Sequence, residues 1–264
     1  MDTDDLTKNI QKIELSMLDE LSKILDKHEI RYFLAFGTAL GCIRHRGFIP
    51  WDDDVDLYLW GEDYPKLKKV FETEKIENLE LHDFSTQKGY PYVFPKIVNK
   101  KTILVENSLK HLDYKCGVYI DIFPLFGIPN NKLLKGLFES IRYFRYCVIR
   151  AYYSYDDNRI TKKILGFIAS RFLSIPKIQY RLYKTYIKPI KDGIKYVQTP
   201  LEFKKTTYLK KCYFEEMRKE KFENLELPIP RECEKYLADY FGNYRLLPPV
   251  EERKSNHDFF IIQF

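Results

Sequence analysis

The stretch GFIPWDDDVDLYLW at positions 47–60 constrains the fold more than any other part of the chain. It places four aspartates within five residues and then continues into apolar and aromatic residues. From Asp54 onward polar and apolar residues alternate, with Asp54, Asp56 and Tyr58 on one face, and a period of two predicts a β-strand. Carboxylates beside a core need a compensating partner, because burying an unpaired charge is costly.

The flanking sequence predicts further helices and strands. Apolar residues three and four apart predict a helix over residues 4–28, followed by a strand, a turn and a short helix closed by Gly47. YPKLKKVFETEK predicts another helix, and YPYVFPKIV, TILVE and GVYIDIFPLF predict strands. In the last of these, Asp121 faces the same way as Tyr119 and Phe123.

Composition divides the chain into three parts: a core over residues 1–130, a helical, basic and aromatic-rich subdomain over 131–212, and a C-terminal segment over 213–264. In TPLEFKKTTYLKKC, Thr199 is the expected N-cap of a helix and Pro200 its first residue. PIPRECEKYLADYFGNY predicts a short helix that stops at Gly242.

Charge and composition narrow the class of protein. The acidic N-terminus differs from a signal peptide, and no apolar run is long enough to span a bilayer. Five cysteines without a C-x-x-C pair indicate free thiols in a reducing compartment. We therefore expect a cytoplasmic protein. Its net charge of +6 suits an anionic partner such as a nucleotide, a phosphorylated glycan or lipid headgroups. Peripheral contact with the inner face of the plasma membrane fits the same charge.

The acidic run admits four interpretations. A calcium-binding EF-hand loop fails, because Leu57 stands where that loop needs glycine and Asp63 where it needs glutamate. A solvated acidic turn is the simplest structural alternative. A divalent metal site for phosphoryl chemistry and the D-x-D motif of a nucleotide-sugar glycosyltransferase are the two enzymatic ones.

Two further features favour phosphoryl chemistry. Residues two apart on a strand project on one face about 7 Å apart, so Asp54 and Asp56 can share one or two Mg²⁺ or Mn²⁺ ions. Asp121, alone in an apolar strand, supplies a third carboxylate. Gly37 and Thr38, at a strand-to-helix turn, offer backbone N–H groups to a phosphate. This is the layout of a nucleotidyltransferase active site.

The sequence closely resembles a known family at these positions. FGTALGCIRHRGFIPWDDDVDL resembles the signature of the LicD family, which includes bacterial phosphocholine transferases, with fukutin and fukutin-related protein as relatives. PKIVNKKTILVE, GVYIDIFPLFG and YFGNYRLLPPVEERKSNH are similar to other blocks of that family. The resemblance covers roughly residues 10–128 and 225–258. It implies a nucleotidyltransferase-like, polymerase-β-type α+β fold, with a small mixed sheet flanked by helices and a helical insertion.

The resemblance also implies an activity: transfer of a phospho-alcohol, such as phosphocholine from CDP-choline, to a sugar hydroxyl of a surface glycan, with release of CMP. Matching positions make Asp54, Asp56 and Asp121 the metal ligands and catalytic acids, and Gly37 with Thr38 the phosphate cradle. Asp52 is a further candidate ligand, whereas Asp53 points off the metal face.

The remaining candidates bind substrate. Arg44 and Lys96 are candidate diphosphate contacts, because guanidinium and ammonium groups pair with phosphate. Glu106, Arg253 and His257 fall in family-like blocks and are expected to close the pocket, which the C-terminal segment completes. The expected partners are a CDP-alcohol and a glycan acceptor, which can be lipid-linked, and not nucleic acid. Two alternatives remain open: a D-x-D glycosyltransferase, and an inactive nucleotide-binding protein of the same fold.

Overall fold

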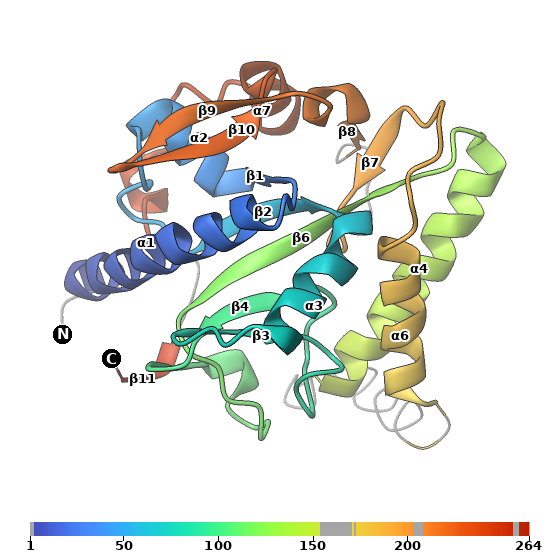
Figure 1. The fold of residues 1–264 in the computed structure, drawn as a ribbon, viewed down its shortest axis with the longest axis horizontal. Coiled ribbons are helices and arrows are strands. Elements are labelled where there is room, and N and C mark those ends of the chain that lie inside the picture. Colours follow the sequence, from blue (N-terminus) through green and yellow to red (C-terminus); the bar gives the residue numbers. More distant parts are fainter. Residues whose placement is uncertain (1–2, 154–170, 172, 203–207, 256–258, 264) are drawn as a thin grey trace.

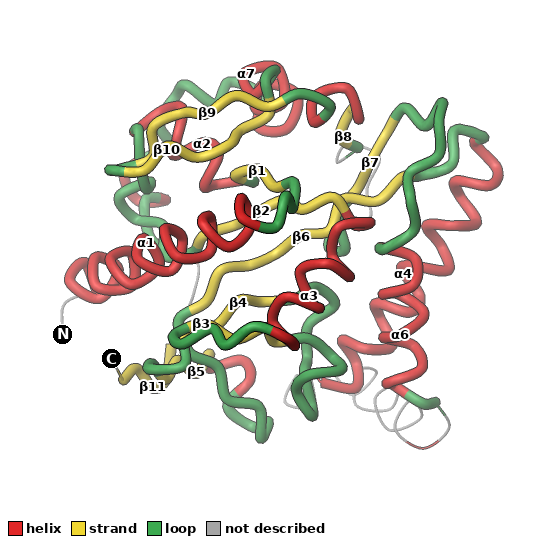
Figure 2. Tube along the Cα trace, in the orientation of Figure 1, coloured by secondary structure: helices red, strands yellow, loops and turns green. Residues whose placement is uncertain are grey.

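The computed structural model describes residues 3–153, 171, 173–202, 208–255 and 259–263. Strands of one mixed sheet run through the centre, with helices on several sides (Figures 1 and 2). The helices are α1 (Thr3–Lys27), α2 (Phe36–His45), α3 (Tyr64–Thr73), α4 (Lys132–Tyr153), α6 (Ile175–Tyr186) and α7 (Cys233–Phe241). The strands of the central sheet are β1 (Tyr32–Leu34), β2 (Val55–Trp60), β3 (Leu79–His82), β4 (Lys96–Asn99), β6 (Tyr119–Gly127), β7 (Tyr196–Gln198) and β8 (Leu209–Lys210).

The central sheet has the order β1-β2-β6-β4-β3, and β7 joins the far end of β6 and pairs with β8. Only β2 and β6 pair in parallel; the other described ladders of this sheet are antiparallel. The sheet is therefore mixed, and the predicted α+β class is confirmed. Residues on both faces of β2 and β6 are buried. The side chains of β2 alternate as predicted: one face of the strand meets the pocket described below, and the other meets the core.

A hairpin holds the acidic loop, residues 46–54 between α2 and β2, against the sheet. It is formed by β9 (Met217–Phe222) and β10 (Leu225–Pro230), and lies beside β1 and α2. At its turn, the Glu223 backbone N–H donates to the Arg46 carbonyl at 2.8 Å, and its carboxylate accepts from the Phe48 N–H at 3.1 Å. The return from α2 to β2 is thereby clamped from outside. Across the molecule, β11 (Phe259–Gln263) pairs with β5 (Ile103–Glu106).

The segment over residues 131–212, predicted as a helical subdomain, contributes two strands, β7 and β8, to the central sheet. Helices α4 and α6 pack side by side and enclose a second apolar cluster with Phe126 near the end of β6 and Ile128 just after it. Strand β7 then pairs with β6 at Phe126 and Gly127. The helices thus extend the core at one end of β6. The domain boundaries drawn from composition stay a prediction.

Most predicted elements are present, with specific differences. The helix expected from Thr199 is wrong in its described part: residues 199–202 form a turn, 209–210 form a strand, and 203–207 lie outside the described residues. Strand β3 was not predicted from the sequence. The β9–β10 hairpin was not predicted either, because MRKEKF in β9 carries charges at most positions and LELPIP in β10 contains two prolines. Helix α7 ends at Gly242 with φ +71°, as its sequence predicts.

Candidate active site

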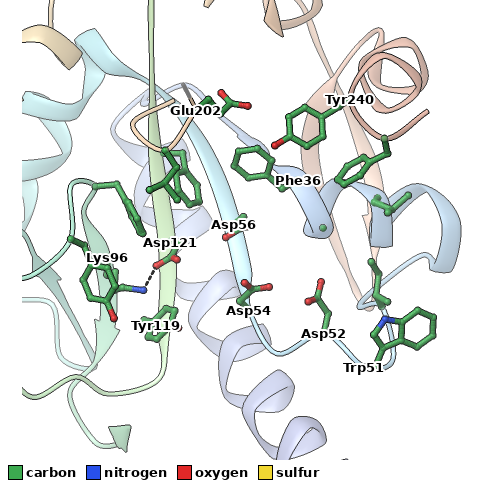
Figure 3. A pocket seen from close by; sticks show the side chains of 18 of the residues that line it. Phe36, Trp51, Asp52, Asp54, Asp56, Lys96, Tyr119, Asp121, Glu202 and Tyr240 are labelled. Carbon is green, nitrogen blue, oxygen red and sulfur yellow. Dashed lines mark hydrogen bonds and ion pairs between the residues drawn. The ribbon is translucent and has the colours of Figure 1, made fainter. Parts of the chain in front are cut away.

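A pocket of about 1230 Å³ opens beside the acidic loop and is lined by residues from α2, β2, β4, β6, α4 and α7 (Figure 3). Residues from all three compositional parts of the chain therefore meet in it. Eight acidic and three basic side chains line the pocket within the described residues. The acidic ones are Asp52, Asp54, Asp56, Glu106, Asp121, Glu139, Glu202 and Glu252.

The centre of the pocket is an aspartate pair on neighbouring strands. In the parallel ladder of β2 and β6, Asp56 lies directly beside Asp121, and Asp54 lies just before β2. Burial raises the pKa of Asp56 well above its usual value, and the charges of Asp54 and Asp121 raise it further. Tyr119 and Phe123 share this face with Asp121, as the alternation predicts. Ionising both carboxyl groups of the pair is therefore costly unless a cation compensates their charge.

Lys96 compensates part of this charge. Its ammonium lies 2.6 Å from an Asp121 carboxylate oxygen, and the side chain is buried. The ammonium also sits over three aromatic rings, with centroid distances of 3.3 Å to Tyr119, 4.3 Å to Tyr92 and 5.4 Å to Phe94. Burial raises the pKa of Asp121 and the Lys96 charge opposes that rise. The structure therefore assigns Lys96 a contact that sequence reasoning missed: the partner of Asp121.

Gly37 and Thr38 lie in the first turn of α2 and play different parts. A Cβ at Gly37 would come within 2.7 Å of an Asp52 carboxylate oxygen, so glycine lets the acidic loop approach the helix. The buried Thr38 hydroxyl accepts the Asp56 backbone N–H at 2.9 Å and fixes the start of β2. Gly37 lines the pocket, whereas Thr38 supports it from behind. Phe36 also faces the pocket, with an uncommon φ of +39°.

The two predicted arginines, Arg44 and Arg253, lie where the C-terminal segment borders the pocket. Arg44 lines the pocket and donates to the carbonyls of Tyr244 at 3.0 Å and Leu246 at 3.3 Å. Burial and the nearby Arg253 charge lower the pKa of Arg44. Arg253 lies over the Trp51 ring at 5.5 Å and holds the C-terminal segment against the acidic loop. Arg44 faces the pocket, and Arg253 braces the segment behind it.

Glu106 lines the opposite wall, where it accepts hydrogen bonds from the hydroxyls of Tyr92 at 2.5 Å and Tyr119 at 3.4 Å. His257 lies outside the described residues. Asp53 does not line the pocket; it is buried and accepts a hydrogen bond from the Ser255 hydroxyl, in keeping with its predicted orientation off the metal face.

The acidic residues suit a metal held jointly with a substrate. Within the described ranges, no three His, Cys, Asp or Glu side chains form a ready-made ligand cage. Mg²⁺ is commonly held by one or two carboxylates, with substrate phosphates and waters completing its shell. Asp54 and Asp56 supply such carboxylates in one pocket, and a cation would offset the charge that raises the pKa of Asp56. The donor set therefore fits Mg²⁺ or Mn²⁺.

Sequence reasoning missed the upper wall of the pocket, where Glu202 and Tyr240 lie near Phe36 (Figure 3). Glu202 is buried, and burial raises its pKa to about 7. Arg142 of α4 holds this turn by donating to the carbonyls of Thr199 at 3.2 Å and of the following proline at 3.1 Å. No local motif marks Glu202, which reaches the pocket through long-range packing. Tyr240 opens the family-like block YFGNYRLLPPVEERKSNH, but nothing in that block singles it out as a pocket residue.

The chain is similar to named proteins over this whole region. The family description "LicD/FKTN/FKRP, nucleotidyltransferase domain" matches residues 29–154. The lipopolysaccharide cholinephosphotransferase LicD of Haemophilus influenzae is 32% identical over 258 residues, which cover 94% of each chain. The chain belongs to the LicD family. Human ribitol 5-phosphate transferase FKRP is 30% identical over 111 residues, 42% of this chain and 19% of that one. The corresponding mouse protein is 29% identical over the same length.

Membership confirms the predicted family and places residues 29–154, with the aspartate pair, in its nucleotidyltransferase domain. The match to the Haemophilus LicD covers 94% of this chain and so reaches beyond residue 154 into the C-terminal segment. The polymerase-β-type arrangement stays a prediction.

Proposed function

We propose that this protein transfers phosphocholine from CDP-choline to a sugar hydroxyl of a cell-surface glycan, such as lipopolysaccharide, teichoic acid or capsule, and releases CMP. The observation that carries the proposal is the placement of Asp54, Asp56 and Asp121 in one pocket of a LicD-family chain. The relatives named a cholinephosphotransferase and a ribitol 5-phosphate transferase support transfer of a phospho-alcohol.

In this proposal Asp54 and Asp56 hold Mg²⁺ or Mn²⁺. A bound divalent ion neutralises the donor diphosphate and the charge that develops on it. The acceptor hydroxyl oxygen forms a bond to the choline-bearing phosphorus, and the bond from that phosphorus to CMP breaks. Asp121 takes the hydroxyl proton, a role that its raised pKa suits. Lys96 orients the Asp121 carboxylate through their ion pair.

The charge of the pocket favours a cationic alcohol. Its eight acidic side chains outnumber its three basic ones, so the potential attracts the trimethylammonium group of choline more than a neutral polyol. Aromatic rings such as Phe36, Trp51 and Tyr240 also line it, and aromatic faces bind quaternary ammonium groups. Choline is therefore preferred over glycerol or ribitol in this proposal.

A donor panel tests the reaction. We expect the protein with Mg²⁺ to release CMP from CDP-choline faster than from CDP-ethanolamine, CDP-glycerol or CDP-ribitol when a glycan acceptor is present. Release of a nucleoside diphosphate from a UDP-sugar would instead show the glycosyltransferase. Absence of turnover with every donor would leave the inactive nucleotide-binding protein.

The variant Asp56→Asn tests the role of the aspartate pair. We expect CMP release to fall by about 10²-fold or more, because the ligand charge is lost while the side-chain size is kept. Asp63→Asn is the matched control: it lies just beyond the other end of the same strand and pairs with Arg31 away from the pocket, so its turnover should stay unchanged. Undiminished turnover in Asp56→Asn would contradict the metal assignment.

A further inference from the structure

Helix α4 carries an exposed apolar stripe. Leu133, Leu134, Leu137, Ile141 and Phe144 are exposed, from 42% for Ile141 to 81% for Leu133. At about 100° per residue, these five positions fall within one arc of about 100° around the helix. A continuous apolar surface of this kind is uncommon on a protein face that meets only water, and it indicates an interaction site.

The stripe borders the pocket on one side. Gly136, Glu139, Ser140 and Tyr143 of the same helix line the pocket, and they fall on the arc next to the stripe. The far side of α4, which includes Arg142 and Ile149, is buried against the rest of the molecule. Whatever covers the stripe therefore lies beside the pocket.

Basic side chains border the stripe on its other side. Arg145 follows Ile141 around the helix, and both line a groove with Lys188 and Lys191 from the segment after α6. Both lysines are exposed, and Asp192 is the one acidic residue between positions 187 and 195. Arg145, Lys188 and Lys191 together form a basic rim.

Further cations extend from this rim along α6. Lys177, Arg181 and Lys184 are all exposed and follow one another at spacings of four and three, so they lie on one face of α6, and the exposed Lys188 follows just after the helix ends. The stripe and the basic rim, which meet in the groove at Ile141, therefore place apolar side chains next to clustered positive charge.

We propose that the α4 stripe and the basic rim dock the protein on an anionic lipid bilayer, with the pocket beside the membrane surface. An amphipathic helix that lies in the membrane interface buries its apolar side chains among the acyl chains, while nearby lysines and arginines contact anionic headgroups. No helix within the described ranges is long and apolar enough to cross a membrane. The docking that we propose is peripheral. Docking would bring a lipid-linked glycan acceptor close to the pocket.

Vesicle sedimentation tests the docking without any turnover, so its result does not depend on the proposed reaction. We expect the full chain to sediment with vesicles of phosphatidylcholine and phosphatidylglycerol at 3:1, and much less with phosphatidylcholine alone. Leu137→Ser with Phe144→Ser should weaken this binding about tenfold or more, because two exposed apolar side chains are lost. Lys188→Gln with Lys191→Gln should weaken it about fivefold for each lysine and reduce its salt dependence.

Matched controls separate the stripe from general surface effects. Met217 on β9 is 58% exposed, as is Leu137, so Met217→Ser should leave binding unchanged. Lys8 and Lys12 are exposed one turn apart on α1. Changing both to Gln should leave vesicle binding and its salt dependence unchanged. Circular dichroism and thermal melting should show all variants folded, because the altered side chains are exposed.

Three outcomes would overturn the proposal. The wild-type chain could fail to bind anionic vesicles, or the α4 variant could bind as well as Met217→Ser. Alternatively, analytical ultracentrifugation could show a dimer that Leu137→Ser with Phe144→Ser dissociates, without vesicle binding by either form. The last result would assign the stripe to a second copy of this chain.

Discussion

Glu14 on α1 is a buried carboxylic acid next to the aspartate run. It is 1% exposed, and its Oε2 has no hydrogen-bond partner within the described residues. Burial raises its pKa well above the usual value, and the charges of Asp54, Asp53 and Asp52 raise it further. Burial and the neighbouring negative charges therefore favour the protonated form of Glu14 in the folded protein more than in the unfolded chain.

This difference predicts a pH-dependent effect of Glu14→Gln. A glutamate with a raised folded-state pKa destabilises the fold progressively as pH rises above its unfolded value of about 4.3. Glutamine removes that penalty, so the stability gain of the variant should grow by about 1 kcal/mol or more between pH 5 and pH 8. Urea unfolding with EDTA measures it. The exposed Glu77→Gln is the control, and an equal gain at both pH values would contradict the assignment.

At the scale of elements, close packing fixes the end of β2 against α6. A Cβ at Gly61 would lie 2.0 Å from the Tyr186 carbonyl oxygen and 2.9 Å from that of Leu125. Both neighbours are backbone atoms, so the helix and the strand would have to separate. By contrast, a Cβ at Gly136 in the interior of α4 meets nothing within 4 Å.

These two glycines give opposite predictions. Gly61→Ala should lower the free energy of unfolding by about 1–3 kcal/mol or more, as overpacking does. Gly136→Ala should raise it by about 0.5–1 kcal/mol, because alanine lowers the entropy cost of a helix. Chemical denaturation of both variants measures the difference. A neutral Gly61→Ala would show that α6 does not pack against this turn.

Sequence periodicity predicted the elements with strong patterns and missed those without one. The α1 helix, the acidic strand and the strand with Asp121 follow from their apolar spacing. The turn after Thr199 is held by Arg142, a contact between residues 57 apart in sequence, which overrides the helix signal of its proline. Local patterns do not contain such a contact.

For the whole molecule, the cluster of buried carboxyl groups predicts how the stability of the fold depends on pH and on bound metal. The pKa values of Asp56 and Glu14 are raised, so the metal-free fold should lose stability as pH rises above the ordinary carboxylate range. Mg²⁺ binds deprotonated carboxylates, so its stabilising effect should be larger at pH 8 than at pH 5.5, by about 2–4 °C in Tm.

Thermal melting at the two pH values measures this effect, with KCl at equal ionic strength as the control for screening. In Asp56→Asn the Mg²⁺ effect should disappear, and the metal-free variant should melt higher than the wild type, because a buried charge is gone. An equal shift by KCl would show that no specific Mg²⁺ site exists.

The sequence by itself determined the family, the α+β class and the run of acids that opens β2, because these are local patterns. It also placed Asp121 on the face that it shares with Tyr119 and Phe123. Only the tertiary structure decided that Lys96 neutralises Asp121, that Glu202 and Tyr240 enter the pocket, and that α4 exposes an apolar stripe. These are contacts and exposures between segments far apart in the chain, and they depend on which surfaces the folded elements bring together.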